Sequence, residues 1–215
     1  MIPDWVRERR RMVDEQLRAH RIVDERVLAA MAAIPREDFV PLETRVMSYA
    51  DGPVELGFGQ TISQPYMTAL MAQLLELKGS EVVLDVGSGS GYAAAVLGTL
   101  AARVISIELI KGLADLARRN LRRTDRDANV TVVAGDGSGG YPGGAPYDAI
   151  FVAAGAPRVP DALIAQLSDP GRLVIPVGTR YDQSLTVVTK RDGATESRVE
   201  TQCRFVLLRG SEGWR

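Results

Sequence analysis

The feature that most constrains the fold is an alternation of short apolar runs with helix-like stretches after residue 78. The runs are short enough to be strands, and they are Val82–Val86, Val104–Ile107, Val130–Val133, Ala149–Ala153 and Leu173–Val177. The stretches with helical periodicity between them are Tyr92–Leu100, Gly112–Leu121 and Pro160–Leu167. Strands that alternate with helices of this length are typical of right-handed crossovers. The pattern therefore predicts an α/β fold with a doubly wound, mainly parallel sheet.

Two apolar runs at the carboxyl end, Leu185–Lys190 and Cys203–Leu208, follow each other without a helix. Polar residues around Asp192 and Gly193 separate them, and such residues favour a tight reversal of the chain. We therefore expect an antiparallel strand pair at the end of the sheet.

The first 78 residues predict an N-terminal helical extension. Pro3 and Asp4 can start one helix, and Asp24 can cap a second that Pro35 ends. Residues 51–65 are too rich in Gly and Pro for a regular element, so they predict a structured loop. After Ser63 an apolar stripe at helical spacing predicts a third helix, and it consists of Met67, Leu70, Met71, Leu74 and Leu77.

Charge and cysteine content restrict the possible partners. The 26 Lys and Arg side chains nearly balance the 27 Asp and Glu side chains, for a formal net charge of -1, so nucleic acid is not an expected partner. The single Cys203 cannot form an internal disulfide, which favours a reducing compartment. The arginines at 7–11 lack a following apolar core, and the most apolar stretch, 92–107, is too short for a bilayer span. We expect a cytoplasmic protein without a membrane partner.

A glycine-rich turn follows the first predicted strand and leads directly into a helix. It comprises Asp85, Gly87, Ser88, Gly89 and Gly91. Ligands gather at such strand ends, and glycine lets the backbone approach them closely. A reading from Gly89 also fits a dinucleotide fingerprint, so the turn alone does not separate NAD from S-adenosylmethionine.

Two further acidic positions lie at the ends of neighbouring predicted strands. Glu108 closes the second strand, where a carboxylate could accept hydrogen bonds from both ribose hydroxyls. Asp136 and Gly137 follow the third strand, where Asp136 could face an adenine amino group and Gly137 could leave room for the ring. Each acidic residue alone could be a solvated strand end or a turn former. Their conjunction with the glycine-rich turn indicates an adenosine-containing cofactor.

Several longer motifs carry a resemblance to a known family. They are IPREDFVP at 34–41, YADGPVELGFGQTISQPYM at 49–67, VLDVGSGSGY at 83–92, the GDG at 135, APYDAIFVAAGAP at 145–157 and GRLVIPVG at 171–178. With these motifs the chain resembles the protein-L-isoaspartate O-methyltransferases. General S-adenosylmethionine enzymes share the glycine turn but not the segment GQTISQP.

The resemblance implies a Rossmann-like S-adenosylmethionine-dependent methyltransferase fold and a specific set of site residues. It also implies two parts of one compact unit: N-terminal helices with the active-site loop at 1–78, and a cofactor-binding α/β part at 79–215. Ser63 matches the family's active-site serine. The positions that match cofactor-binding residues are Gln60, Thr61, Ile62, Ser63, Thr68, Asp85, Gly87, Ser88, Gly89, Glu108, Leu109, Asp136 and Gly137.

The implied reaction transfers a methyl group from S-adenosyl-L-methionine to the free carboxylate of L-isoaspartyl residues in damaged proteins and peptides. S-adenosyl-L-homocysteine is then the coproduct, no metal is needed, and the protein is expected to act as a monomer. A carboxyl group with a pKa of about 4 is already ionised at neutral pH, so the reaction needs no general base. This agrees with a chain whose only histidine is His20, and it disfavours a Ser/His/Asp hydrolase.

Two departures from the family pattern affect the substrate side. Phe205-Val206-Leu207-Leu208 stands where relatives have FVPL, and Pro170-Gly171 stands where many relatives have Gly-Gly. A methyltransferase for an Asp carboxylate of one dedicated peptide therefore remains an alternative, as do a non-catalytic S-adenosylmethionine-binding module and an NAD oxidoreductase. For Ser63 itself, the alternative is a simple helix cap before Pro65.

Overall fold

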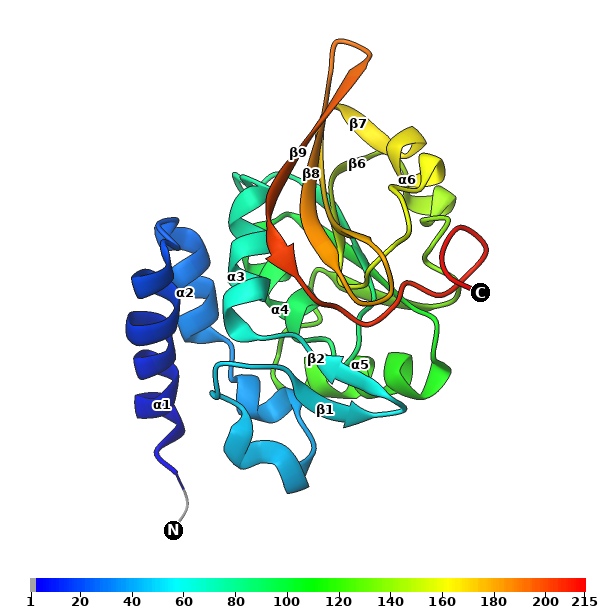
Figure 1. The fold of residues 1–215 in the computed structure, drawn as a ribbon. Helices are drawn as coiled ribbons and strands as arrows, with labels where there is room; N and C mark the ends of the chain where they lie inside the picture. Colours follow the sequence, from blue (N-terminus) through cyan, green and yellow to red (C-terminus); the bar gives the residue numbers. More distant parts are fainter. Residues whose placement is uncertain (1–2) are drawn as a thin grey trace.

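The structure is a computed structural model that describes residues 3–215, and its centre is a seven-stranded sheet (Figure 1). The strand order is β5-β4-β3-β6-β7-β8-β9. The strands are β3 (Val82–Val86), β4 (Arg103–Glu108), β5 (Val130–Ala134), β6 (Tyr147–Val152), β7 (Leu167–Gly178), β8 (Gln183–Arg191) and β9 (Ala194–Cys203). The strands from β5 to β7 pair in parallel, whereas β8 and β9 join antiparallel. This arrangement confirms the predicted fold class.

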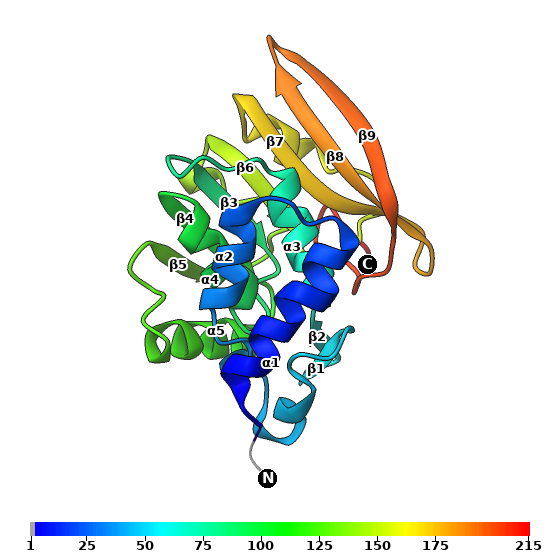
Figure 2. The same ribbon diagram turned by 90° about the vertical axis from the view of Figure 1, so that its left-hand side faces the viewer.

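Helices cover the two faces of the sheet unequally (Figure 2). They are α1 (Trp5–Arg11), α2 (Glu25–Ala33), α3 (Pro65–Leu74), α4 (Tyr92–Leu100), α5 (Lys111–Arg123) and α6 (Asp161–Ala165). A π-helical stretch, Met12–Leu17, and a 3-10 turn, Arg18–His20, continue α1. Three more 3-10 segments are Arg36–Phe39, Leu42–Met47 and Pro142–Gly144. Side chains of α2 to α5 share one hydrophobic cluster with Val83 and Val104, while Leu163 of α6 packs on the opposite face with Leu84.

The N-terminal helices begin where their capping residues predict. The Asp24 carboxylate accepts hydrogen bonds from the backbone amides of Arg26 and Val27, and Asp4 accepts one from Arg7. Both contacts satisfy amides that have no partner inside the helix. The large hydrophobic cluster contains residues of both 1–78 and 79–215, and the division between these two parts stays a prediction. None of the described helices combines the length and apolarity that crossing a bilayer requires.

Two details of the sequence interpretation are wrong. The segment 51–65 contains a small antiparallel sheet of β1 (Val54–Gly57) and β2 (Gln60–Ile62), whereas the sequence predicts a structured loop without a regular element. Glycine makes this hairpin possible, because Gly57 and Gly59 adopt positive φ of 84° and 67° at the reversal.

The other error concerns the partner of β8, which is the polar segment 194–203 and not Cys203–Leu208. Asp192 and Gly193 form the tight turn of this hairpin, so pairing starts immediately after the turn. The strand β9 is an edge strand, and burial at an edge is too small to impose an apolar pattern on it. Residues 203–209 instead run past the carboxyl end of β6, where Leu207 forms an isolated bridge with Gly155.

Candidate active site

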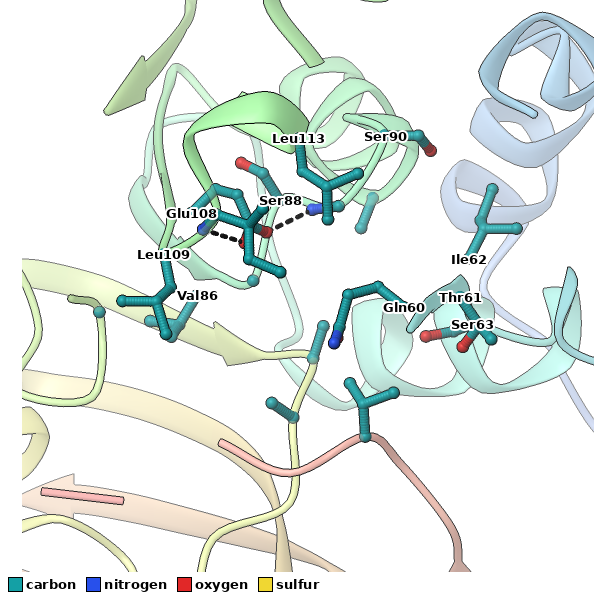
Figure 3. Close-up of a pocket in the computed structure, with 18 of the residues that line it drawn as sticks. Gln60, Thr61, Ile62, Ser63, Val86, Ser88, Ser90, Glu108, Leu109 and Leu113 are labelled. Atoms are coloured by element: carbon teal, nitrogen blue, oxygen red, sulfur yellow. Dashed lines mark hydrogen bonds between the residues drawn. The ribbon is translucent and has the colours of Figure 1, made fainter. Parts of the chain in front are cut away.

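A cleft lies at the carboxyl ends of β3 and β4, next to the point where the strand order reverses from β3 to β6. We call it the strand-end cleft. The glycine turn after β3 and the end of β4 form one side, and the hairpin β1–β2 forms the other (Figure 3). Its volume, counted with the open solvent at its mouth, is about 1000 Å³. Reversals of strand order are where open α/β sheets bind their ligands.

The glycine turn is held against β4 by backbone hydrogen bonds. The amides of Gly87 and Ser88 both donate to the Ile107 carbonyl, at 2.9 and 3.3 Å. Gly91 adopts a positive φ of 91°, and a Cβ there would lie 3.2 Å from the Ala117 Cα atom of α5. Glycine is therefore needed at this position for both backbone conformation and helix packing. These contacts place the start of α4 directly at the cleft.

Glu108 is the one acidic side chain that lines this cleft among the described residues. It is only 6% exposed, and its two oxygens accept hydrogen bonds from the amides of Gly89 and Ile110, each at 2.9 Å (Figure 3). No described Lys, Arg or His forms an ion pair with it. The carboxylate is thus fixed in one orientation and keeps capacity to accept hydrogen bonds from ligand hydroxyls.

Asp85 lies beneath the glycine turn and does not line the cleft. It is completely buried, and burial raises the pKa of its carboxyl to about 7. Its only side-chain hydrogen bond among the described residues comes from the Ser106 hydroxyl, which also contacts the Ser88 hydroxyl. Asp85 therefore reaches the cleft only through two serines.

Asp136 also lies outside the lining of the cleft. Its carboxylate accepts hydrogen bonds from the amide and hydroxyl of Ser138 and from the amide of Ser211, so it fastens the C-terminal loop. Gly137 does line the cleft, and it has a packing role there as well. A Cβ at Gly137 would lie 2.7 Å from Ile107 Cγ2, so glycine lets the floor of the cleft pack.

Ser63 directly follows β2, and its surroundings contradict a capping role. The helix α3 begins at Pro65, its N-cap residue is Gln64, and no described side chain caps it. Ser63 is half-buried, and its carbonyl accepts a hydrogen bond of 2.8 Å from Arg36 Nη2. Figure 3 shows Gln60, Thr61 and Ser63 on the side of the cleft opposite Glu108. The hydroxyl of Ser63 is thus available to a ligand.

A second cavity, which we call the C-terminal cavity, adjoins the strand-end cleft. Its volume, including the open mouth, is about 1270 Å³. Ser63 belongs to the wall between the two spaces, and the other residues that line both are Thr61, Ala153, Val206 and Leu207. Arg180 and Arg204 line only the C-terminal cavity, and no Asp or Glu among the described residues does so.

Long-range backbone contacts fix the wall that the C-terminal segment contributes. The Gly155 amide donates to the Val206 carbonyl at 2.7 Å, and the Leu208 amide donates to the Gly155 carbonyl at 2.9 Å. The Gln183 side chain both donates to and accepts from the backbone of Phe205. Residues Val206 and Leu207 are therefore held at the carboxyl end of β6.

Most residues that the sequence singles out thus meet in one place. All the predicted cofactor positions except Asp85 and Asp136 line the strand-end cleft. Sequence reasoning missed Leu56, Tyr92, Arg180 and Arg204, which line one cavity or the other. The two arginines had no usable signal, because they come from loops that meet the site only through the tertiary fold. Tyr92 was expected only as the first residue of a helix.

The doubly wound sheet and the cleft at its reversal point define the class of Rossmann-like α/β proteins that bind a nucleoside cofactor at the strand ends. The chain belongs to the protein-L-isoaspartate(D-aspartate) O-methyltransferase family, whose model matches residues 7–213.

Individual relatives agree with this membership over nearly the whole chain. A protein-L-isoaspartate O-methyltransferase of Hyperthermus butylicus is 50% identical and covers 99% of this chain and 93% of its own. Protein-L-isoaspartate O-methyltransferase 2 of Marinobacter nauticus is 54% identical over 96% of this chain and 94% of its own. A solved protein-L-isoaspartate O-methyltransferase superposes with a TM-score of 0.83 at 30% identity, covering 95% of this chain and 67% of that one.

A second solved structure contains a ligand. It is a putative protein-L-isoaspartate O-methyltransferase from Plasmodium falciparum in complex with S-adenosyl-L-homocysteine. Its TM-score is 0.79 at 27% identity, and the match covers 94% of this chain and 98% of that one.

Proposed function

We propose that this chain transfers the methyl group of S-adenosyl-L-methionine to the free carboxylate of L-isoaspartyl residues in damaged proteins and peptides. The single observation that carries the proposal is the position of Ser63 in the wall shared by the strand-end cleft and the C-terminal cavity. A transferase must bring a donor and an acceptor together at one point, and two adjoining cavities provide such a point. Membership in the family supplies the chemical identity of the two ligands.

The strand-end cleft fits the cofactor. Glu108 would accept hydrogen bonds from the ribose hydroxyls, and the glycine turn at 87–89 would let the ligand approach the backbone. The remaining proposed cofactor positions along the lining are Gln60, Thr61, Ile62, Thr68, Leu109 and Gly137. We further propose that Asp85 and Asp136 support the cofactor site through Ser106 and the C-terminal loop, without touching the ligand. The bound cofactor supplies an electrophilic methyl group on a sulfonium.

The C-terminal cavity would receive the peptide, with its isoaspartyl carboxylate directed at Ser63. The acceptor is already anionic at neutral pH, so no group has to remove a proton from it. The Ser63 hydroxyl would donate one hydrogen bond that orients the carboxylate while leaving the attacking oxygen free. Arg180 and Arg204 would attract anionic substrates toward the cavity. The site thus works mainly by positioning.

The proposed product is a methyl ester of the isoaspartyl side chain. An ester is a better leaving system than a carboxylate, so the neighbouring backbone nitrogen can close a succinimide ring and release methanol. The succinimide then opens partly to normal aspartate. The enzyme has to perform only the first step of this repair.

The direct test uses methyl-labelled S-adenosyl-L-methionine and two peptides that differ only in carrying isoAsp or Asp. We expect base-labile label on the isoAsp peptide, followed by release of methanol and formation of succinimide. Labelling of the Asp peptide alone would favour the alternative of a methyltransferase for one dedicated peptide. Binding of S-adenosyl-L-homocysteine without any transfer would favour a binding module, and binding of NAD in its place would favour an oxidoreductase.

The role of Ser63 has its own test in Ser63→Ala. We expect kcat to fall by about 10- to 100-fold, because one orienting hydrogen bond to a charged group is lost, while the affinity for S-adenosyl-L-homocysteine stays within about twofold. Ser80→Ala, at an exposed serine before β3, is the matched control and should keep the parent kcat. A kcat for Ser63→Ala within twofold of the parent would remove this serine from the mechanism.

We also infer that the protein acts as a monomer in the cytoplasm on damaged proteins and peptides, with no nucleic-acid or membrane partner. The near-neutral composition supports the absence of polyanion binding. Cys203 is a free thiol, and burial raises its pKa to about 11, which disfavours the reactive thiolate at neutral pH. Light scattering of the purified protein should give a mass near 23.3 kDa. A mass twice as large would contradict the monomer.

A further inference from the structure

Arg36 is a completely buried guanidinium in the N-terminal part of the chain, with 0% exposure. It lies in the 3-10 segment Arg36–Phe39, and it is absent from the lining of both cavities. Arginine retains its charge even where burial lowers its pKa, as burial does here. Burying a charge costs free energy unless neighbouring groups form hydrogen bonds or ion pairs with it, so the contacts of this side chain indicate its role.

The guanidinium connects two separate segments through their backbones. Its Nε donates to the Ser48 carbonyl at 2.6 Å, and its Nη2 donates to the Ser63 carbonyl at 2.8 Å. Its central carbon lies 4.9 Å from the centre of the Tyr92 ring, within the range of a cation–π contact. Tyr92 in turn lines the strand-end cleft as the first residue of α4. One side chain therefore links the active-site segment to the helix that follows the glycine turn.

No carboxylate neutralises this guanidinium among the described residues. The neighbouring Glu37 is engaged elsewhere, because one of its oxygens forms an ion pair of 2.8 Å with Arg9 and the other accepts a hydrogen bond from the Tyr49 hydroxyl. Arg36 Nη1 is buried and has no hydrogen-bond partner within the described structure. For stability alone, an apolar side chain would fill this space at lower cost.

The geometry points to Arg36 as a positioning residue for methyl transfer. Arg36 fixes the backbone of Ser63, so that the Ser63 hydroxyl stays in the wall between the strand-end cleft and the C-terminal cavity. The rigid fork of a guanidinium can hold two carbonyls at once, whereas an ammonium is a single point charge. The residue acts through Ser63 and does not touch either ligand. This inference rests on the proposed function, because it assigns a role in that reaction.

Arg36→Lys and Arg36→Met test the role together. We expect kcat for an isoAsp peptide to fall by at least about 10-fold in Arg36→Lys and further in Arg36→Met, because a misplaced catalytic group loses rate steeply. The Kd of S-adenosyl-L-homocysteine, measured by titration calorimetry, should stay within about threefold, because Glu108 and the glycine turn are intact. The rates are corrected for the folded fraction from circular dichroism at the assay temperature.

Arg9→Met is the matched control, because Arg9 is also part-buried in the N-terminal layer but contacts Glu37 and Tyr49 instead of Ser63. It should lower the Tm and leave kcat unchanged. A second readout is Arg36→Ala with added methylguanidine, which should restore part of kcat, while an equal concentration of urea should not.

The inference fails if kcat per folded molecule in Arg36→Met lies within twofold of the parent. It also fails if neither Arg36→Lys nor Arg36→Met folds while Arg9→Met does, because Arg36 is then a stability residue. Failure of the proposed function is distinguishable, since the parent itself would then transfer no methyl group to the isoAsp peptide.

Discussion

The strand-end cleft and the C-terminal cavity share the Ser63 wall but differ in how they are built and charged. The cleft combines the glycine turn and the strand ends with the hairpin β1–β2 and residues 206–209, and its buried charged side chain is Glu108. The cavity is formed by loops from distant parts of the chain, and it contains Arg180 and Arg204 without a described carboxylate. The cleft has the buried Glu108 carboxylate and also the exposed Arg209 in its lining, whereas the cavity has two exposed arginines and no described carboxylate.

This difference matches the two ligands of the proposed reaction. A sulfonium nucleoside is cationic near its reacting carbon and presents hydroxyls, so an acceptor carboxylate suits it. An isoaspartyl side chain is anionic, so guanidinium groups suit it. The buried Glu108 on one side, and two arginines without a described carboxylate on the other, favour each ligand in its own space. The comparison predicts that changes on one side should alter the binding of only one ligand.

The largest effect should come from Glu108→Gln. The glutamine amide keeps the shape of the carboxylate but loses its charge. The two oxygens of Glu108 accept hydrogen bonds from the backbone amides of Gly89 and Ile110, and in the variant an NH₂ group must face one of these two donors. A hydrogen bond to a charged group is worth about 1.5–3 kcal/mol, so we expect the Kd of S-adenosyl-L-homocysteine to rise by roughly 100-fold. Titration calorimetry measures this change.

The peptide side supplies the control for Glu108→Gln. At saturating cofactor, the KM for an isoAsp peptide should stay within about twofold of the parent. Glu55→Gln, on the exposed face of β1, should change neither constant. If the peptide KM changed as strongly as the cofactor Kd, the two spaces would not be independent.

A smaller effect is expected for Asp85→Asn beneath the glycine turn. Burial raises the pKa of Asp85 to about 7 from 3.8, so between these two pH values the folded protein binds more protons than the unfolded chain. Its stability therefore falls as pH rises through this window. The amide that replaces the carboxyl has no charge to desolvate, so the variant should gain about 2 kcal/mol relative to the parent between pH 5 and pH 8.

Urea unfolding of the ligand-free protein at several pH values measures this gain. The parent's unfolding free energy should decline more steeply than that of Asp85→Asn from pH 5 to pH 7, and the two curves should run parallel above pH 8. Parallel curves throughout would show that Asp85 has an ordinary pKa. The peptide KM should not respond, because Asp85 lies on the cofactor side.

The same contrast explains how much of the molecule the sequence predicts. The glycine turn, Glu108 and the first parallel strands are local features, because each depends on a few adjacent residues with a distinct pattern. The partner of β8 was missed because an exposed edge strand lacks apolar periodicity. The hairpin β1–β2 was missed because its short apolar alternation, Val54 and Leu56, lies among glycines and prolines that are typical of loops. Arg36, Arg180 and Arg204 gain their roles only from contacts with residues far along the chain. Periodicity carries no information about such contacts.

The smallest effect should come from Arg204→Gln and Arg180→Gln. Both side chains are exposed at the rim, where attraction to a substrate is modest and screened by salt. Peptides with acidic residues beside the isoAsp should show a kcat/KM about three- to fivefold lower in the double variant, and peptides with neutral flanks should show almost no change.

Salt and position provide the controls for this last prediction. At about 0.5 M NaCl the difference between acidic and neutral flanks should largely disappear in the parent as well, because the Debye length falls to about 4 Å. Arg191→Gln, at the end of β8 in the hairpin, removes the same single charge as Arg204→Gln but away from the cavity, and it should leave the preference intact. If Arg191→Gln lowered the preference as much as Arg204→Gln, net charge would be responsible. The C-terminal cavity would then not distinguish substrates by its own arginines.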